Sequence, residues 1–243
     1  HNLGVRELSR KYAFGADAPA VEYVPQRDRR TFRGYRRIDG RVGTRNYIAV
    51  ISTVGCSAHT CREIARRFPP ERLAGFPNVD GVIALAHPFG CSICAGGPDH
   101  VLLAGTLAGM ARNPNVGGAI VVGLGCETTQ SSDVLKKYAL WSYGTDTPTQ
   151  LPLVLMIQEV GGIQKTVEAG ILAVQDLLPK VNTIRRTDQP ISELALALQC
   201  GGSDGWSGVT ANPVVGLVAD EVVRQGGPVP MRNRAIHRVA SHH

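Results

Sequence analysis

Residues 47–57 read YIAVISTVGCS, a short apolar run rich in β-branched side chains that ends in glycine, cysteine and serine. β-branched residues favour strands, and a continuous apolar run is typical of a strand that is buried on both faces. A helical pattern follows over residues 56–68. The stretch therefore predicts one strand–turn–helix unit of a parallel sheet, with a thiol in its turn.

The same pattern recurs four more times along the chain. Further strands are expected at 81–86 (GVIALA), 118–124 (GAIVVGL), 151–157 (LPLVLMI) and 194–198. Helical patterns follow them over 99–112, 131–140, 162–178 and 213–224. These units predict an α/β fold, namely a Rossmann-like three-layer domain with a mostly parallel sheet of about five strands. Pro152 and Pro190 weaken the last two strands, because proline lacks the N–H that a strand ladder needs.

Composition separates a central region from two flanks. Residues 1–40 are polar and rich in arginine and are interpreted as an N-terminal arm or linker, 41–226 as the central α/β domain, and 227–243 as an irregular tail left by truncation or by an expression tag. The chain contains no apolar run of about 18 residues and no signal-peptide core. We therefore expect a cytoplasmic protein without a membrane partner.

The formal net charge of +6 arises largely from arginines within residues 27–45. Such a basic segment attracts nucleic acid or anionic small molecules. Few aromatic residues accompany it and no nucleic-acid motif occurs, so we expect no nucleic-acid partner and favour an anionic small molecule or a solvated arm. The six cysteines lie beside glycines at spacings unlike those of a disulfide framework, which indicates reduced thiols.

Thiols and glycines follow the ends of the expected strands. Cys56, Cys91, Cys126 and Cys200 each lie in the turn after a strand, and all five turns contain glycine and a polar side chain. Because the carboxyl ends of parallel strands meet at one edge of a sheet, we expect these turns to form a shared ligand site. Helices that begin there favour a bound carboxylate or phosphate.

Two motifs in the turn after the second strand have alternative interpretations. His87 and Cys91 lie four residues apart across a glycine turn, a spacing at which imidazole and thiolate can chelate Fe, Zn or Co. The alternative is a histidine whose ring caps the turn. Cys91 and Cys94 form a CxxC pair, which can be a redox motif, whereas no second CxxC supports a zinc knuckle.

Glu127 and the segment CGGSDGWSG (200–208) are further candidates for chemistry. Glu127 could transfer protons if its pKa is raised; alternatively it is a carboxylate that satisfies a helix dipole. The glycine-rich segment could hold a carboxylate, sugar hydroxyls or a phosphate through its main-chain amides, or it is a plain flexible loop. Neither a Walker motif nor GxGxxG occurs in the sequence, so the common nucleotide fingerprints are absent.

Four long segments resemble sequences of the altronate/galactarate dehydratase family. They are GYRRIDGRVGTRNYI (34–48), HPFGC (87–91), NPNVGGAIVVGLGCE (113–127) and SELALALQCGGSDGWSGVTANPVVG (192–216). The resemblance covers about residues 1–226 and implies the central domain of a longer protein, whose remaining domains are its partners. A homo-oligomer is left open. Ser92, where the family commonly has glycine, and the unusual Cys94 leave the particular substrate open.

The resemblance implies a hydro-lyase that dehydrates a sugar acid of the altronate or galactarate type to a 2-keto-3-deoxy acid, assisted by a divalent metal, Fe2+ first and Mn2+ or Zn2+ as alternatives. The implied metal ligands are Cys56, His87, Cys91, Cys126 and Cys200. The implied substrate-binding residues are Arg41, Thr44, Arg45, Asn46, Gly201, Gly202, Ser203 and Asp204. Glu127 and His87 are the implied catalytic residues, although the base could lie in another domain. A non-catalytic metal- or anion-binding module and a thiol redox protein are the alternative functions.

Overall fold

The computed structural model describes residues 20–131, 152–199, 204–229 and 231–232. The chain divides into two compact units. Thr31–Pro190 forms the larger one, here called the sheet unit, and the terminal unit combines His1–Arg30 with Ile191–His243. The boundaries inferred from composition, after residues 40 and 226, stay predictions.

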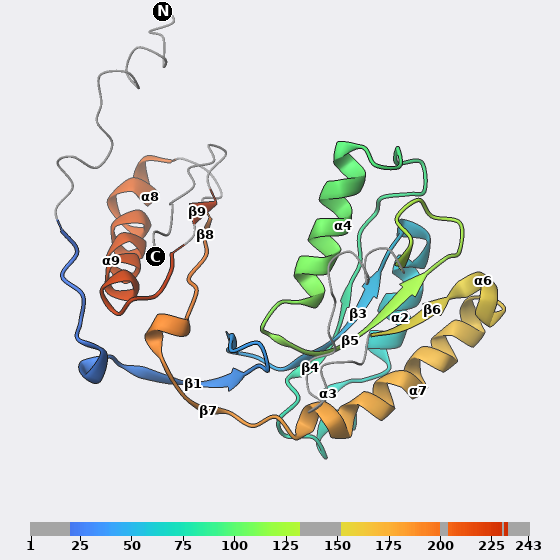
Figure 1. The fold of residues 1–243 in the computed structure, drawn as a ribbon, viewed down its shortest axis with the longest axis horizontal. Helices are drawn as coiled ribbons and strands as arrows, with labels where there is room; N and C mark the ends of the chain where they lie inside the picture. Colours follow the sequence, from blue (N-terminus) through green and yellow to red (C-terminus); the bar gives the residue numbers. More distant parts are fainter. Residues whose placement is uncertain (1–19, 132–151, 200–203, 230, 233–243) are drawn as a thin grey trace, which may run out of the picture. The chain divides into compact units, whose positions relative to one another are not determined.

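A four-stranded parallel sheet forms the centre of the sheet unit (Figure 1). Its strands are β3 (Tyr47–Ser52), β4 (Gly81–Leu85), β5 (Val116–Gly123) and β6 (Leu153–Met156). They lie in the order β4-β3-β5-β6, and each neighbouring pair is parallel. The mixed α/β architecture and these four strands agree with the sequence prediction.

The expected fifth strand, residues 194–198, does not join this sheet. Its backbone N–H groups are used inside the terminal unit, where Leu194 N donates to Ile191 O and Leu196 N donates to Pro228 O. Only β8 (Leu198–Gln199) is extended there, and it pairs with β9 (Met231–Arg232) in a separate two-stranded sheet. Five strands in one sheet was therefore wrong for the described part of the chain.

Helices pack on both faces of the parallel sheet (Figure 1). Ile48 and Val50 of β3 pack with α2 (Ala58–Arg66) and α7 (Ile163–Asn182), while Ala49 of the same strand packs with α4 (Pro98–Ala111). Successive residues of a strand point to opposite faces, so a strand covered on both sides must be apolar throughout. Shorter turns of helix are η2 (Gly55–Ser57), α3 (Pro70–Leu73) and α6 (Ile157–Val160). Of the helix expected over 131–140, only Ser131 lies within the described residues.

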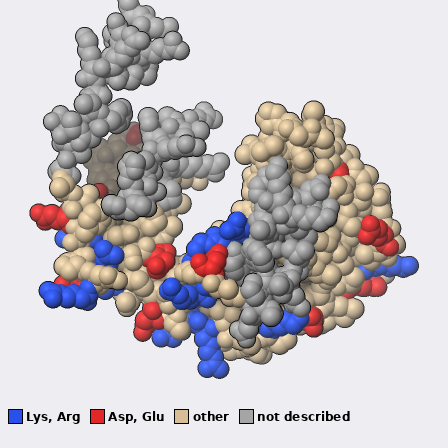
Figure 2. Space-filling model, in the orientation of Figure 1, with Lys and Arg blue, Asp and Glu red and all other residues tan. Residues whose placement is uncertain are grey.

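A small antiparallel sheet, with the order β2-β1-β7, was not foreseen from the sequence. It consists of β1 (Thr31–Arg36), β2 (Val42–Gly43) and β7 (Thr187–Pro190). The register of β1 and β7 places Thr31 opposite Pro190. Figure 2 shows Lys and Arg atoms gathered around β1. Arginines on a short strand obscured its pattern, which is why this part was expected to be an arm.

The terminal unit contains η1 (Gln26–Asp28), η3 (Ile191–Glu193), α8 (Gly205–Val209) and α9 (Ala211–Arg224). The helix predicted over 213–224 is confirmed as α9. None of the helices in the described ranges is long and apolar enough to cross a membrane.

Cys61 belongs to the core of the sheet unit and differs chemically from the other described cysteines. It is buried on α2, and this burial raises the pKa of its thiol to about 12. The described cysteines in the loops are exposed.

We expect iodoacetamide, applied to the folded chain at about pH 8, to alkylate the exposed thiols much faster than Cys61, because only a thiolate reacts. Peptide mass spectrometry over time measures the labelling of each site, and the same reaction in denaturant should remove the difference. Equal rates in the folded chain would contradict the burial of Cys61.

Candidate functional site

The strand order determines where a ligand is expected. Along the chain, the strand after β3 is β4, which lies on one side of it, whereas the next strands, β5 and β6, lie on the other side. The order in which strands are added to the sheet therefore reverses direction between β3 and β5. In open α/β sheets, ligands bind at such a switch point, outside the carboxyl ends of the strands. The loops there are residues 53–57, 86–97 and 124–130, here called the carboxyl-end loops.

The three carboxyl-end loops lie against one another. Gly55 N donates a hydrogen bond to Phe89 O at 2.6 Å, which joins the first loop to the second. Thr128 Oγ1 donates to the carbonyl of Cys91 at 2.7 Å, which joins the third loop to the second. A Cβ atom on Gly55 would lie only 2.8 Å from Pro88 O, so a larger residue would push the loops apart.

Glu127 ties the first loop to the third. It is 3% exposed, and its Oε1 accepts a hydrogen bond from Thr53 Oγ1 at 2.7 Å. Gly125 N donates to Oε2 at 2.7 Å, and Leu124 N donates to Oε1 at 3.2 Å. Burial raises the pKa of Glu127, but these hydrogen bonds outweigh burial and leave the pKa below its ordinary value. The carboxylate is therefore a buried acceptor that shapes the loop, and its part in proton transfer stays a prediction.

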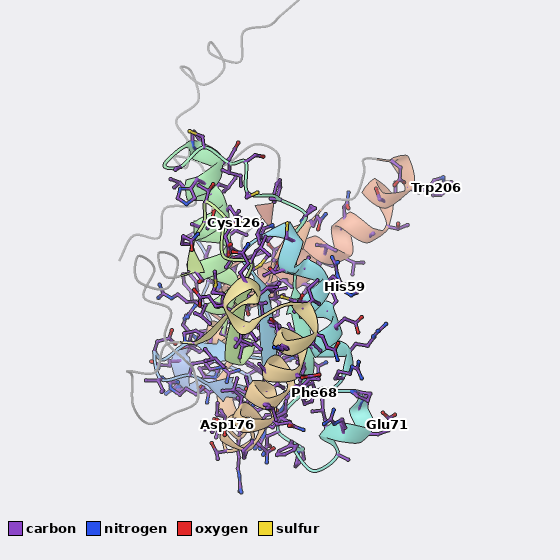
Figure 3. All side chains as sticks on the ribbon, turned by 90° about the vertical axis from the view of Figure 1, so that its right-hand side faces the viewer. His59, Phe68, Glu71, Cys126, Asp176 and Trp206 are labelled. Carbon is purple, nitrogen blue, oxygen red and sulfur yellow. The ribbon has the colours of Figure 1, made fainter. Side chains whose placement is uncertain are left out.

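Three of the predicted metal ligands expose their thiols on the carboxyl-end loops: Cys56, Cys91 and Cys126. Figure 3 shows Cys126 near one end of the sheet unit, with Phe68 and Asp176 toward the other end. Among the described residues, however, no three His, Cys, Asp or Glu side chains are close enough together to hold a metal ion. Cys200 lies outside the described residues. The thiols suit a transition metal chemically, but the described donors do not complete a site, and the metal stays a prediction.

His87 lies at the start of the second carboxyl-end loop. Its backbone N–H donates to Ser52 Oγ at 3.3 Å, and its Nδ1 accepts from the backbone N–H of Phe89 at 3.2 Å. Nε2 is buried and has no hydrogen-bond partner in the described part of the chain. Burial lowers the pKa of His87 below its ordinary value, although the carbonyls of Ser52 and Thr53 act in the opposite direction. Because Nδ1 accepts a hydrogen bond, it carries no proton, and the ring is neutral in this arrangement.

Arg41, Thr44, Arg45 and Asn46, which were predicted to bind substrate, lie at the opposite edge of the sheet. Asn46 directly precedes Tyr47, the first residue of β3, whereas the carboxyl-end loops follow the other ends of the strands. A strand rises by about 3.3 Å per residue, so the six residues of β3 separate the two edges by about 20 Å. Within the sheet unit, the structure does not bring these four residues together with the cysteines.

The polar residues at this amino-terminal edge form a structural network. Asn46 is fully buried; its Nδ2 donates to Asn78 O at 2.7 Å and to Val181 O at 3.1 Å. Its Oδ1 accepts from Arg37 Nη1 at 2.8 Å, and Arg37 is itself buried. The amide therefore joins the start of β3 to the end of α7.

Carboxylates already pair with two of the predicted substrate arginines. Arg45 Nη1 lies 3.1 Å from Asp80 Oδ1, and Arg41 Nη2 lies 2.6 Å from Asp39 Oδ2. The Asp80 hydrogen bond raises the pKa of Arg45 further. Thr44 N and Arg45 N both donate to the side chain of Asn115, at 2.8 and 3.0 Å.

Comparison of the sequence with known protein families identifies the family of this chain. The family model described as "D-galactarate dehydratase/Altronate hydrolase, second domain" matches residues 34–182, well over half of the chain. This chain belongs to the D-galactarate dehydratase/altronate hydrolase family. The second-domain match falls within the sheet unit. A further match, to "D-galactarate/Altronate dehydratase, C-terminal", covers residues 191–233 in the terminal unit of this family member.

Individual relatives support the same assignment. The chain is 35% identical over 219 residues to "Altronate dehydratase" of Bacillus subtilis (strain 168), covering 87% of this chain and 42% of the relative. It is 37% identical over 215 residues to "Galactarate dehydratase (L-threo-forming)" of Escherichia coli (strain K12), covering 86% and 40%. A "(2R)-sulfolactate sulfo-lyase subunit beta" of Chromohalobacter salexigens is 31% identical over 197 residues, covering 81% and 45%. This family member thus spans less than half the length of these relatives.

The predicted substrate segment of this family member is described only in part. Cys200, Gly201, Gly202 and Ser203 lie outside the described residues. Asp204 caps α8, and its Oδ1 accepts from Ser207 N at 2.8 Å. Hydrogen bonds from Ser207 hold the pKa of Asp204 below its ordinary value. A substrate role for this segment stays a prediction.

Sequence reasoning missed two residues that organise the edges of the sheet. Thr53 supplies the hydroxyl that Glu127 accepts, and Asp80 accepts from Arg45, from Arg186 and from the backbone of Asn46. The signal for Thr53 was a polar residue that directly follows a strand. Asp80 directly precedes one, which is a signal for the amino-terminal edge.

We expect Glu127→Gln to reduce the free energy of unfolding by about 2 kcal/mol near pH 7, because the amide nitrogen replaces an acceptor for buried donors. The folded-state pKa of Glu127 is lowered, so its stabilising effect is present above the unfolded-state value and is lost as pH falls through the folded-state pKa. The difference between variant and wild type should therefore shrink in acid. Urea unfolding followed by circular dichroism at several pH values measures this, with the exposed Glu168→Gln as the matched control. Equal stabilities at neutral pH would show that the carboxylate is not a buried acceptor.

We expect Asn46→Ala to cost roughly 3 kcal/mol of unfolding free energy, because it removes the buried hydrogen bond from Arg37 Nη1 and the two hydrogen bonds to the carbonyls of Asn78 and Val181. Gln164→Ala on the exposed face of α7 is the control and should change stability by less than about 0.5 kcal/mol. Thermal and urea denaturation give both values. A loss of substrate affinity without any loss of stability would instead restore Asn46 to a binding role.

Proposed function

We propose that this chain is part of a sugar-acid dehydratase that removes water from an altronate- or galactarate-type acid to give a 2-keto-3-deoxy acid. The observation that carries the proposal is the match of residues 34–182 to the dehydratase second domain. The candidate site at the switch point between β3 and β5 supports the proposal, because the three carboxyl-end loops bring thiols, main-chain amides and hydroxyls to one edge of the sheet.

The reaction sets requirements that the site can be compared with. A base removes the weakly acidic proton next to the carboxylate, and the hydroxyl on the neighbouring carbon leaves as water after it receives a proton. The resulting enol tautomerises to the ketone. Negative charge that develops on the substrate needs donors or a cation nearby.

The carboxyl-end loops offer donors to an anionic substrate. α4 begins after Gly97, an N-cap residue without a side chain to cap the first amides, and its positive end lies at this edge of the sheet. A substrate carboxylate or hydroxyl is suited to such a helix start. In this proposal Glu127 holds the third loop in shape, and the base that removes the proton comes from another part of the protein.

We also propose a divalent metal as cofactor, Fe2+ first and Mn2+ or Zn2+ as alternatives. The exposed thiols of Cys56, Cys91 and Cys126 are its candidate ligands from the described residues. Because these donors do not complete a site, the proposal requires Cys200 or a ligand from the rest of the protein.

A second candidate function is an elimination from a sulfonated hydroxy acid, which the similarity to the sulfo-lyase subunit favours. Both candidates remove a leaving group next to an acidic C–H bond. They differ only in the group that leaves.

The test is an anaerobic assay of the longest protein that contains this chain, with altronate, galactarate and (2R)-sulfolactate and with each metal in turn. We expect a 2-keto-3-deoxy product from one of the sugar acids, detected by mass spectrometry. Cys126→Ser should lower turnover by at least about 10-fold, whereas Cys94→Ser, outside the proposed ligand set, should not. Turnover of sulfolactate alone would replace the first proposal with the second. Absence of turnover with every acid and metal would overturn both.

A further inference from the structure

We infer that His87 donates a hydrogen bond through Nε2–H to an oxygen atom of an acid or water bound at the carboxyl-end loops. We infer also that His87 is not a metal ligand. This deepens the proposed function and rests on it for the identity of the bound acid.

The first step concerns the other ring nitrogen. The backbone N–H of Phe89 donates to Nδ1 at 3.2 Å, so the lone pair of Nδ1 is in use. A neutral imidazole has one donor and one acceptor nitrogen, and an accepting Nδ1 therefore places the proton on Nε2. Metal binding through Nε2 would need the opposite tautomer, in which Nδ1–H and the Phe89 N–H would face each other.

The loop geometry fixes this arrangement. The carbonyl of the same Phe89 accepts from Gly55 N at 2.6 Å, and the rings of His87 and Phe89 lie 5.8 Å apart between centroids. Turning the imidazole over would therefore disturb the contact between the first and second carboxyl-end loops. The backbone of His87 is also held, by Ser52 Oγ at 3.3 Å.

The second step concerns Nε2 itself. This atom is buried and makes no hydrogen bond with any residue that the structure describes. A buried N–H without an acceptor is costly, by about 1–3 kcal/mol, so an oxygen atom brought beside it is stabilised. Hydroxyl, carboxylate and water are the acceptors that match, whereas a metal cation is not.

The position of the ring links it to the rest of the site. Ser52, which holds the His87 backbone, directly precedes Thr53, the donor to Glu127. The imidazole therefore lies at the carboxyl end of β3, beside the switch point.

A nuclear magnetic resonance experiment on the full chain tests the tautomer without any assay. The chain has seven histidines, and 15N-histidine labelling with long-range 1H–15N correlations gives the tautomer of each. His87→Phe assigns the signals. We expect the Nε2–H form for His87, unchanged when Fe2+ or Zn2+ is added. The Nδ1–H form, or a shift of Nε2 typical of metal binding, would overturn the inference.

Adding galactarate and altronate to the labelled chain tests the ligand. We expect the Nε2–H signal to shift with one of these acids, and the His59→Gln variant, altered on the exposed surface of α2, should show the same shift. No shift at saturating concentrations of both acids would overturn the donor role.

Two measurements on the longest protein separate this inference from the proposed function. We expect His87→Phe to keep the metal content of wild type, determined anaerobically by mass spectrometry, and to lower kcat roughly 100-fold with little change in KM. Loss of metal would overturn the inference while leaving dehydration intact. If the wild type turns over no acid, the proposed function fails, and the tautomer and metal content still decide the assignment of His87.

Discussion

β3 is hydrogen-bonded on one side to β4 and on the other to β5, and five of its six residues are buried. Asn46 before the strand and Thr53 after it are buried, so their polar groups need partners inside the protein. At one end Asn46 meets this need with Arg37, Asn78 and Val181. At the other end Thr53 meets it with Glu127. Both networks follow from the burial of this strand.

The two ends of β3 differ in the polar groups that they leave available to bind a ligand. At the amino-terminal edge the buried amide of Asn46 is fully paired, and Arg45 faces Asp80. At the carboxyl-terminal edge, thiols are exposed, and Nε2 of His87 makes no hydrogen bond within the described ranges. The family signature around residues 34–48 thus leads into the amino-terminal edge of the sheet, and the signatures around 87–91 and 113–127 reach the carboxyl-end loops. A motif can identify a family through its scaffold as readily as through its chemistry.

Much of the sheet was predictable because strands buried on both faces must be continuously apolar. β3 and β5 satisfy this rule, and their ends were located to within about two residues. β1 was not predicted as a strand, because it carries arginines and belongs only to a small antiparallel sheet. The fifth strand was misjudged because an apolar run does not reveal which neighbour will accept its hydrogen bonds.

The sequence predicted the positions of the candidate site residues better than it predicted their chemical roles. Residues that follow parallel strands share an edge, which located Cys56, Cys91 and Cys126 on adjoining loops. The same rule, applied to Asn46 just before β3, would have assigned it to the other edge. The pKa of Glu127 could not be read from sequence, because it depends on backbone donors whose direction only the folded loop fixes.

The pairing of β1 with β7 also determines how the chain can assemble. This ladder places Thr31 opposite Pro190, and just beyond it Ile191 N donates to Arg30 O at 2.9 Å. The two segments of the terminal unit are separated in sequence by the whole sheet unit, and bringing them together in an unfolded chain would carry a large loop-closure entropy. Once the sheet unit has folded, the β1–β7 ladder already holds the adjoining ends of both segments side by side. The entropy cost of forming the terminal unit is then lower than in an unfolded chain.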